Sequence, residues 1–338
     1  MGLQVTSSGD CGIREFPLDD FPEDLARQIF ETAVRDPDTP NWACSRVSRK
    51  IQAWVEPSLY RDITLYYNQS ITLIHNTLIS TIARKSSKPP AFFDNVRSLC
   101  IIPAYLPLWG DIMDLLSACT SLRTLHIFNW LAEGQEEFLI GNHPAWNALR
   151  LRRLRIPALL FHPSHLNLDM KSHPMFAHIT HLELPWVTHD VIDKDWSWAS
   201  LSSLETLTHL CLVTAVLFFL LDNASAQLQA AVPHFPSSLI VCVFEIRTLG
   251  KRFSNAEQVV LNNGRLLDSR VVVAVDHEYY CEEVELQKEC VRSWIKEEAI
   301  WRKEDPWGRN WTEEVDAMWK QAEAKVAQRR SERVLERS

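Results

Sequence analysis

The amino-acid sequence predicts an α/β protein with a helical unit at its start, a stack of short parallel strands in its middle and a helical extension at its end. Three observations favour this class. Apolar residues recur at helical spacing within the first 60 positions, a six-residue apolar motif repeats between 96 and 244, and residues beyond 280 are rich in charge. We expect a disordered tail over 1–15, a helical domain over 16–66, a repeat domain over 67–280 and a charged helical extension over 281–338.

Residues 21–34 predict an amphipathic helix. Leu25, Ile29 and Ala33 recur every four positions, the spacing that aligns side chains on one face of a helix. Pro22 stands where a first-turn proline is tolerated. The two prolines within 36–40 are expected to end this helix.

A second helix is predicted from Trp42 to about Trp54, and Pro57 is expected to stop it. Residues 59–66 then alternate between polar and apolar types, which is typical of a strand. A unit of roughly forty residues is too small for a self-sufficient core. We therefore expect it to lean on a partner protein or on the domain that follows.

The middle of the chain repeats the pattern L-x-x-L-x-L, with other apolar residues allowed at each L. Clear copies lie at 96–101, 122–127, 151–156, 179–184 and 207–212, with a weaker copy at 239–244 and a trace at 271–273. The copies begin 26 to 32 residues apart, which matches a leucine-rich repeat whose strands return through helices. Each copy predicts one short strand, and the stacked strands predict a parallel sheet.

Details of the repeats add three expectations. The Asn that normally ties adjacent repeats together is missing, so the array is degenerate. Returning helices are predicted over 107–118, 196–204 and 217–228. His181 and His209 occupy the same motif position, so we expect them to be neighbours on one surface rather than convergent metal ligands.

The last part of the chain predicts two charged helices. One covers 282–304 and is broken by 305–308, where a proline and a glycine occur together. The next helix begins near Thr312. Acidic residues follow Thr312 in its first turn, and arginines occur in its last turns. This charge pattern is compatible both with a solvated extension and with a segment that binds a partner.

Composition excludes several classes of function. The formal net charge of −8 argues against a general nucleic-acid binder. The chain has no glycine-rich phosphate loop, zinc-protease motif or hydrolase elbow, so we expect no enzyme activity, no cofactor and no metal. Its longest apolar run, 210–221, is too short to cross a membrane. The eight cysteines lack paired spacing and predict reduced thiols in an intracellular protein.

The N-terminal segment Phe21-Pro-Glu-Asp-Leu-Ala-Arg-Gln-Ile-Phe30 resembles the opening of an F-box. Residues 42–54 are similar to the second half of that motif. The segment 56–65, Glu-Pro-Ser-Leu-Tyr-Arg-Asp-Ile-Thr-Leu, is similar to the run that follows F-boxes of basidiomycete fungi, where irregular leucine-rich repeats come next. Phe21 departs from the usual Leu, and the linker between the two helices is short.

This resemblance implies a non-enzymatic substrate receptor of an SCF-type (Skp–cullin–F-box) ubiquitin ligase, active in the cytoplasm or nucleus. The F-box would bind a Skp-family adaptor, and through it a cullin–RING ligase, while the repeats bind the target protein. The expected adaptor-binding residues are Phe21, Pro22, Leu25, Ile29, Phe30, Val47, Ile51 and Trp54. Two alternatives remain open: a leucine-rich scaffold whose first helices only cap the repeats, and an enzyme on an α/β fold.

Overall fold

The structure is a computed structural model that divides the chain into two compact units, Met1–Leu59 and Tyr60–Ser338. The residues that the structure describes are 22–35, 41–83, 91–102, 109–128, 143–157, 168, 173–187, 197–217, 226, 228–249, 268–276, 299–302 and 311–335. The tail predicted over 1–15 lies outside them.

The first unit contains the two predicted helical segments. Helix α1 covers Glu23–Val34, a 3₁₀ turn η2 covers Trp42–Arg46, and α2 covers Arg49–Leu59. The expectation that Pro57 stops the second helix is wrong, because Pro57 lies inside α2. It falls in the last turn, where a missing N–H removes only one backbone hydrogen bond from the helix.

In the second unit the described strands form one parallel sheet of nine strands, in the order of the chain. The strands are β1 (Asp62–Tyr66), β2 (Ser98–Ile102), β3 (Thr124–Ile127), β4 (Arg153–Arg155), β5 (His181–Val187), β6 (His209–Leu217), β7 (Val241–Leu249), β8 (Val271–Asp276) and β9 (Ala299–Arg302). The predicted α/β class and its parallel short strands are therefore confirmed. Each clear copy of the apolar motif leads into one strand, from β2 to β6.

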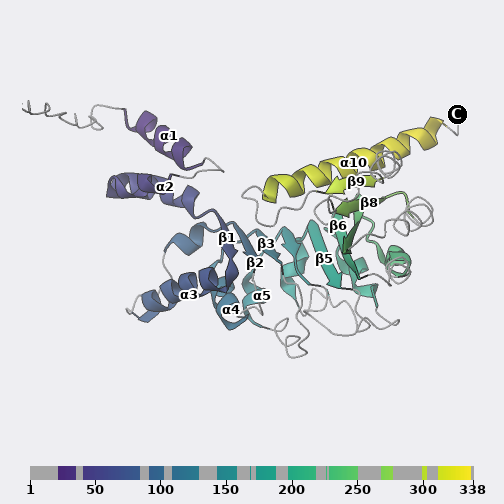
Figure 1. Ribbon diagram of the computed structural model, residues 1–338, viewed down its shortest axis with the longest axis horizontal. Helices are drawn as coiled ribbons and strands as arrows, with labels where there is room; N and C mark the ends of the chain where they lie inside the picture. Colours follow the sequence, from purple (N-terminus) through teal and green to yellow (C-terminus); the bar gives the residue numbers. More distant parts are fainter. Residues whose placement is uncertain are drawn as a thin grey trace, which may run out of the picture. The chain divides into compact units, whose positions relative to one another are not determined.

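The motif residues pack on one face of this sheet. In the five clear copies of the motif the second and third apolar positions are buried in a single core, as Leu99 and Ile101 of β2 illustrate. The covering elements include α3 (Tyr67–Ala83), α4 (Trp109–Ala118) and α5 (Ala145–Ala148). Figure 1 draws α3 and α4 on one side of the strands. The helix predicted over 107–118 is thus confirmed as α4.

The opposite face of the sheet is covered by the long C-terminal helix α10 (Trp311–Leu335). Figure 1 draws this helix in yellow along the later strands. Its buried residues recur at helical spacing and join Cys211, Val213 and Val243 of the sheet in a second core. They are Val315, Met318, Trp319, Ala322 and Val326. The helix expected from near Thr312 therefore exists, and one of its faces is buried rather than solvated.

Threonine and serine side chains at the start of the strands tie neighbouring repeats together. The Thr180 hydroxyl donates to the carbonyl of Arg152 at 3.1 Å, and the Thr208 hydroxyl donates to the carbonyl of Thr180 at 3.0 Å. These bonds satisfy backbone carbonyls between adjacent turns. The side chain of Ser238 does the same for Leu207 at 2.7 Å.

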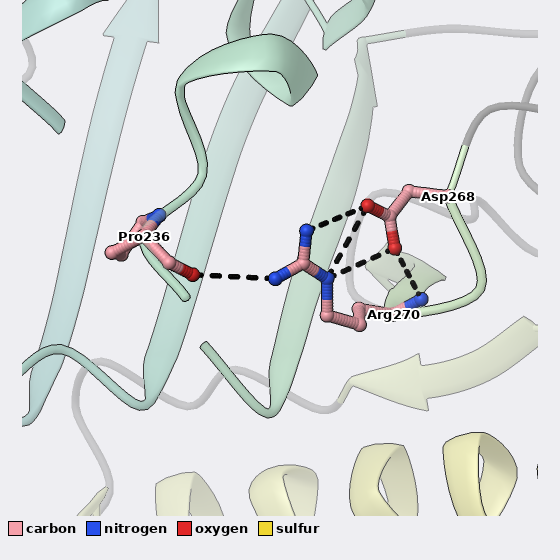
Figure 2. A network of polar contacts seen from close by, with 3 residues as sticks. All are labelled: Pro236, Asp268 and Arg270. Carbon is pink, nitrogen blue, oxygen red and sulfur yellow. Dashed lines mark hydrogen bonds and ion pairs between the residues drawn. The ribbon is translucent and has the colours of Figure 1, made fainter. Parts of the chain in front are cut away.

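A polar clamp holds the turn before β8 (Figure 2). The guanidinium of Arg270 donates to Asp268 at 2.8 Å and to the carbonyl of Pro236 at 3.2 Å. Burial alone would raise the pKa of Asp268, but hydrogen bonds from Arg270 and its positive charge hold the pKa below the ordinary value. The carboxylate therefore stays ionised, and the clamp links this turn to the preceding repeat.

Four predicted elements differ in the structure. Strand β1, placed by sequence in the first domain, pairs with β2 of the sheet, Ile63 opposite Leu99. Residues 299–302, expected to be helical, form β9 because they complete the open edge of β8. Within the helix predicted over 217–228, Leu217 ends strand β6 instead, whereas Ala226 and Leu228 are helical as predicted. The helix predicted over 196–204 is reduced to a 3₁₀ turn, η7 (Ala199–Ser203).

Candidate protein-docking surface

Helix α1 carries apolar residues on two faces, and only one face is buried. Ala26 and Val34 are buried within the first unit, and Phe30 is half-buried. Leu25 and Ile29 lie one turn apart on the other face and remain 51% and 54% exposed. Two large aliphatic side chains held in water on adjacent turns form an apolar stripe that a partner can cover.

The turn η2 and the start of α2 are shaped by local capping bonds. The Oδ1 atom of Asn41 accepts a hydrogen bond from the Ala43 amide, and the Ser48 hydroxyl accepts one from the Ile51 amide. These caps leave Val47 between the two helical segments, where it is 56% exposed. The apolar surface of this unit therefore contains Leu25 and Ile29 from α1 and Val47 from the connection to α2.

The two helices of this unit are joined mainly by buried apolar side chains. Ile51 and Val55 of α2 are fully buried. Lys50 also reaches Glu23 at 2.8 Å and lies over the ring of Trp54. This ion pair is exposed at both ends, so it contributes little to stability.

Seven of the eight expected adaptor-binding residues are described, and they differ in exposure. Leu25, Ile29, Val47 and Pro22 are exposed, so they are accessible to a partner. Phe30 and Trp54 are half-buried, and Ile51 is fully buried, so Ile51 packs the unit. Phe21 lies outside the described residues.

The second unit has a polar cluster where α10 crosses β5 and β6. The rings of His181 and His209 stack with centroids 4.1 Å apart, as expected from their shared motif position, and the ring of Trp319 packs edge-on against both. The Nε2 atom of His209 lies 2.8 Å from Oε1 of Glu323. Arg153 of β4 pairs with Asp316 at the start of α10.

Burial sets the protonation of this histidine pair. It lowers the pKa of His181 to about 3, helped by the neighbouring His209 and Arg153. Burial also lowers the pKa of His209, although Glu323 acts in the opposite direction. Both imidazoles are therefore neutral near pH 7, and the cluster fastens α10 rather than offering a charged catalytic pair.

A buried charge pair lies on the same face of the sheet. Arg155 of β4 donates to Glu183 of β5 at 3.1 Å, and its guanidinium lies over the ring of Phe128. Burial raises the pKa of the adjacent Cys100 thiol well above its ordinary value. The thiol is therefore protonated and unreactive, as expected for a structural cysteine.

The helices on the opposite face share a contact between a histidine and two aspartates. His75 of α3 lies 3.3 Å from Asp111 and 2.9 Å from Asp114, both on α4. This contact links two neighbouring helices. In the part of the chain that the structure describes, no group of three or more His, Cys, Asp or Glu residues could hold a metal ion.

Sequence analysis missed a row of arginines at the edge of the sheet. Arg61, Arg97, Arg123 and Arg152 each precede the first residue of a strand, β1 to β4, and all four are exposed. A signal was present in the sequence, since Arg97, Arg123 and Arg152 occupy the second position of their motif copies. That position was treated as a variable one.

Comparisons of the chain with protein-family models, with curated proteins and with solved structures gave no match. Among the described helices, none combines the length and the apolar character needed to cross a membrane.

Proposed function

We propose that this protein is a non-enzymatic substrate receptor of an SCF-type ubiquitin ligase. Its first unit would bind a Skp-family adaptor as an F-box, and its degenerate leucine-rich repeats would hold the target protein. Such a receptor would act in the cytoplasm or the nucleus. The observation that carries the proposal is the exposed apolar stripe of Leu25 and Ile29, with Val47 on the same unit.

The exposure of these side chains and their positions in the sequence both support the proposal. An isolated apolar residue on a surface is ordinary, but these three lie at positions that the F-box resemblance assigns to the adaptor. Covering aliphatic side chains of this size removes apolar area from water and stabilises a complex by a few kcal/mol at a well-packed interface. A helix that buries one apolar face and exposes another is suited to such a contact.

The test is co-purification of the full chain with a recombinant fungal Skp-family adaptor. Leu25→Asp and Ile29→Asp place a charge in the contact, and each should weaken binding at least about thirtyfold, equivalent to about 2 kcal/mol. Gln28→Asp is the matched control, because Gln28 is exposed on the same helix and the change adds the same charge. It should leave binding unchanged.

Thermal unfolding of each variant separates docking from folding. Both aliphatic residues are half-exposed, so the Asp variants should unfold within a few degrees of the wild type. Absence of any complex between the adaptor and a folded wild-type chain would reject the ligase proposal. It would favour the alternative of a leucine-rich scaffold whose first helices serve only as a cap.

A further inference from the structure

The arginine row consists of Arg61, Arg97, Arg123 and Arg152, and the sheet places its members side by side. Asp62 pairs with Ser98, Ser98 with Thr124, and Thr124 with Arg153, so the residues before them lie in the same register. Adjacent strands are about 4.8 Å apart, so the row extends for roughly 14 Å along one edge of the sheet.

The backbone of the row is fixed by a regular ladder. The carbonyl of Arg61 accepts bonds from the amides of Arg97 and Ser98, and the carbonyl of Arg97 accepts bonds from those of Arg123 and Thr124. The same pattern continues one repeat further, from Arg123 to residues 152 and 153. The four Cα positions are therefore set by the sheet itself rather than by a variable loop.

Two of the guanidinium groups are also held in place. The Nη1 atom of Arg97 donates to the carbonyl of Ser121 at 3.2 Å, and that of Arg123 donates to the carbonyl of Arg150 at 3.0 Å. Each bond uses one of the five N–H donors of the side chain, and the others remain to meet a ligand. Part of the entropy cost of ordering these side chains is thus met before any partner binds.

The row is a local excess of positive charge on a chain whose formal net charge is −8. Within the described residues, Arg61 has a carboxylate nearby, since its Nε atom lies 3.9 Å from Asp62. For Arg97, Arg123 and Arg152, no carboxylate of the described residues lies within ion-pairing distance. Like charges at this spacing repel one another, and an anionic partner would relieve that repulsion.

The linear arrangement of the four arginines favours an extended anion over a compact one. A single phosphate is best held by arginines that converge on one point, whereas these four are spread along a line. An extended peptide presents alternate side chains on one side about 6.8 Å apart, so three acidic residues at alternate positions span about 14 Å. Arginine suits this contact because its planar fork can bind carboxylates through two parallel hydrogen bonds.

We propose that the arginine row is the binding site for an extended acidic segment of another protein, with Asp or Glu at alternate positions. The inference deepens the proposed function, on which it rests for the identity of that protein as the ubiquitination target. The binding surface lies in the second unit and is chemically different from the apolar stripe of the first. The two proposals can therefore fail separately.

The experiment uses the full chain and a fluorescein-labelled peptide, Gly-Asp-Ala-Asp-Ala-Asp-Ala-Gly, with fluorescence anisotropy at low salt. The wild type should bind this peptide, bind its Asn counterpart at least tenfold more weakly, and lose affinity as salt rises. The double variant Arg61→Gln/Arg152→Gln should weaken binding about tenfold. It is the safer variant for folding, because among the described residues neither guanidinium donates to a backbone carbonyl of another repeat, as those of Arg97 and Arg123 do.

The double variant Arg97→Gln/Arg123→Gln should lose at least as much affinity, and its thermal unfolding reports any effect of the lost backbone bonds. The matched control is Arg49→Gln/Arg330→Gln, which makes the same change in charge at exposed positions outside the row. An equal loss in this control would overturn the proposal, because binding would then follow net charge alone. Tighter binding of a dT10 oligonucleotide or of inorganic phosphate would also overturn it.

Adaptor binding is measured in parallel on the same proteins. The Gln variants of the row should keep it, and Ile29→Asp should keep peptide binding. Peptide binding that depends on the row, in a chain that binds no adaptor, would retain the arginine site and reject the ligase function. Adaptor binding in a chain that binds no peptide would retain the ligase function and reject the arginine site.

Discussion

Acidification should loosen the attachment of α10, because this helix packs over a neutral histidine pair. Burial lowers the pKa of His181 from 6.5 to about 3, whereas an exposed imidazole regains the ordinary value. Below pH 6.5 the unfolded chain binds a proton that the folded chain does not, so falling pH favours unfolding. The stabilisation is complete above this range and is lost as the pH falls towards 3.

The magnitude follows from the size of this shift. Between pH 7.5 and pH 5.0 the free energy of unfolding of the second unit should fall by about 2 kcal/mol, or about 1 kcal/mol once solvent screening is allowed for. The lowered pKa of His209 acts in the same direction. Glu183 raises the pKa of His181 and Glu323 raises that of His209, so both carboxylates oppose the loss of stability. Arg153, which pairs with Asp316, lowers the pKa of both histidines and so reinforces it.

The assay is urea unfolding at both pH values, with hydrogen exchange of α10 as a local readout. His181→Phe keeps a flat ring against His209 and Trp319 but removes the titrating group, so it serves as the reference. Its loss of stability on acidification should be smaller than that of the wild type by about 1–2 kcal/mol. Equal losses in the two proteins would refute the reasoning, as would a wild-type change below about 0.5 kcal/mol.

Two further predictions concern the core of the second unit. Glu183→Gln removes the charge that faces Arg155 in the interior, and it should lower the free energy of unfolding by about 3 kcal/mol in a denaturant titration; a change within error would mean that other contacts hold the arginine. Burial raises the pKa of Cys119 to about 12 and raises that of Cys242 further. Both thiols should therefore react with iodoacetamide at pH 8 only after unfolding, and rapid labelling of the native protein, detected by mass spectrometry, would contradict their burial.

Local patterns were sufficient to predict α1, α4 and the strands β2 to β6. The spacing of Leu25 and Ile29 indicates α1, and the apolar motif locates the strands and their parallel order, because each copy carries its own alternation of buried and exposed positions. The shared motif position of His181 and His209 also correctly predicted that they are neighbours in the sheet. These successes share one cause, which is that periodicity within a segment depends only on the geometry of that segment.

Contacts between distant segments were decided by the tertiary structure. Nothing near Trp319 in the sequence indicates that it packs against two histidines more than 100 positions earlier, and residues 299–302 became a strand only because β8 offered them an open edge. Ile51 resembled an interface residue until the packing of α2 buried it. Arg61 likewise joined the arginine row only through the pairing of β1 with β2, since residues that are far apart in the chain meet only when hydrogen bonding fixes which strand positions face each other.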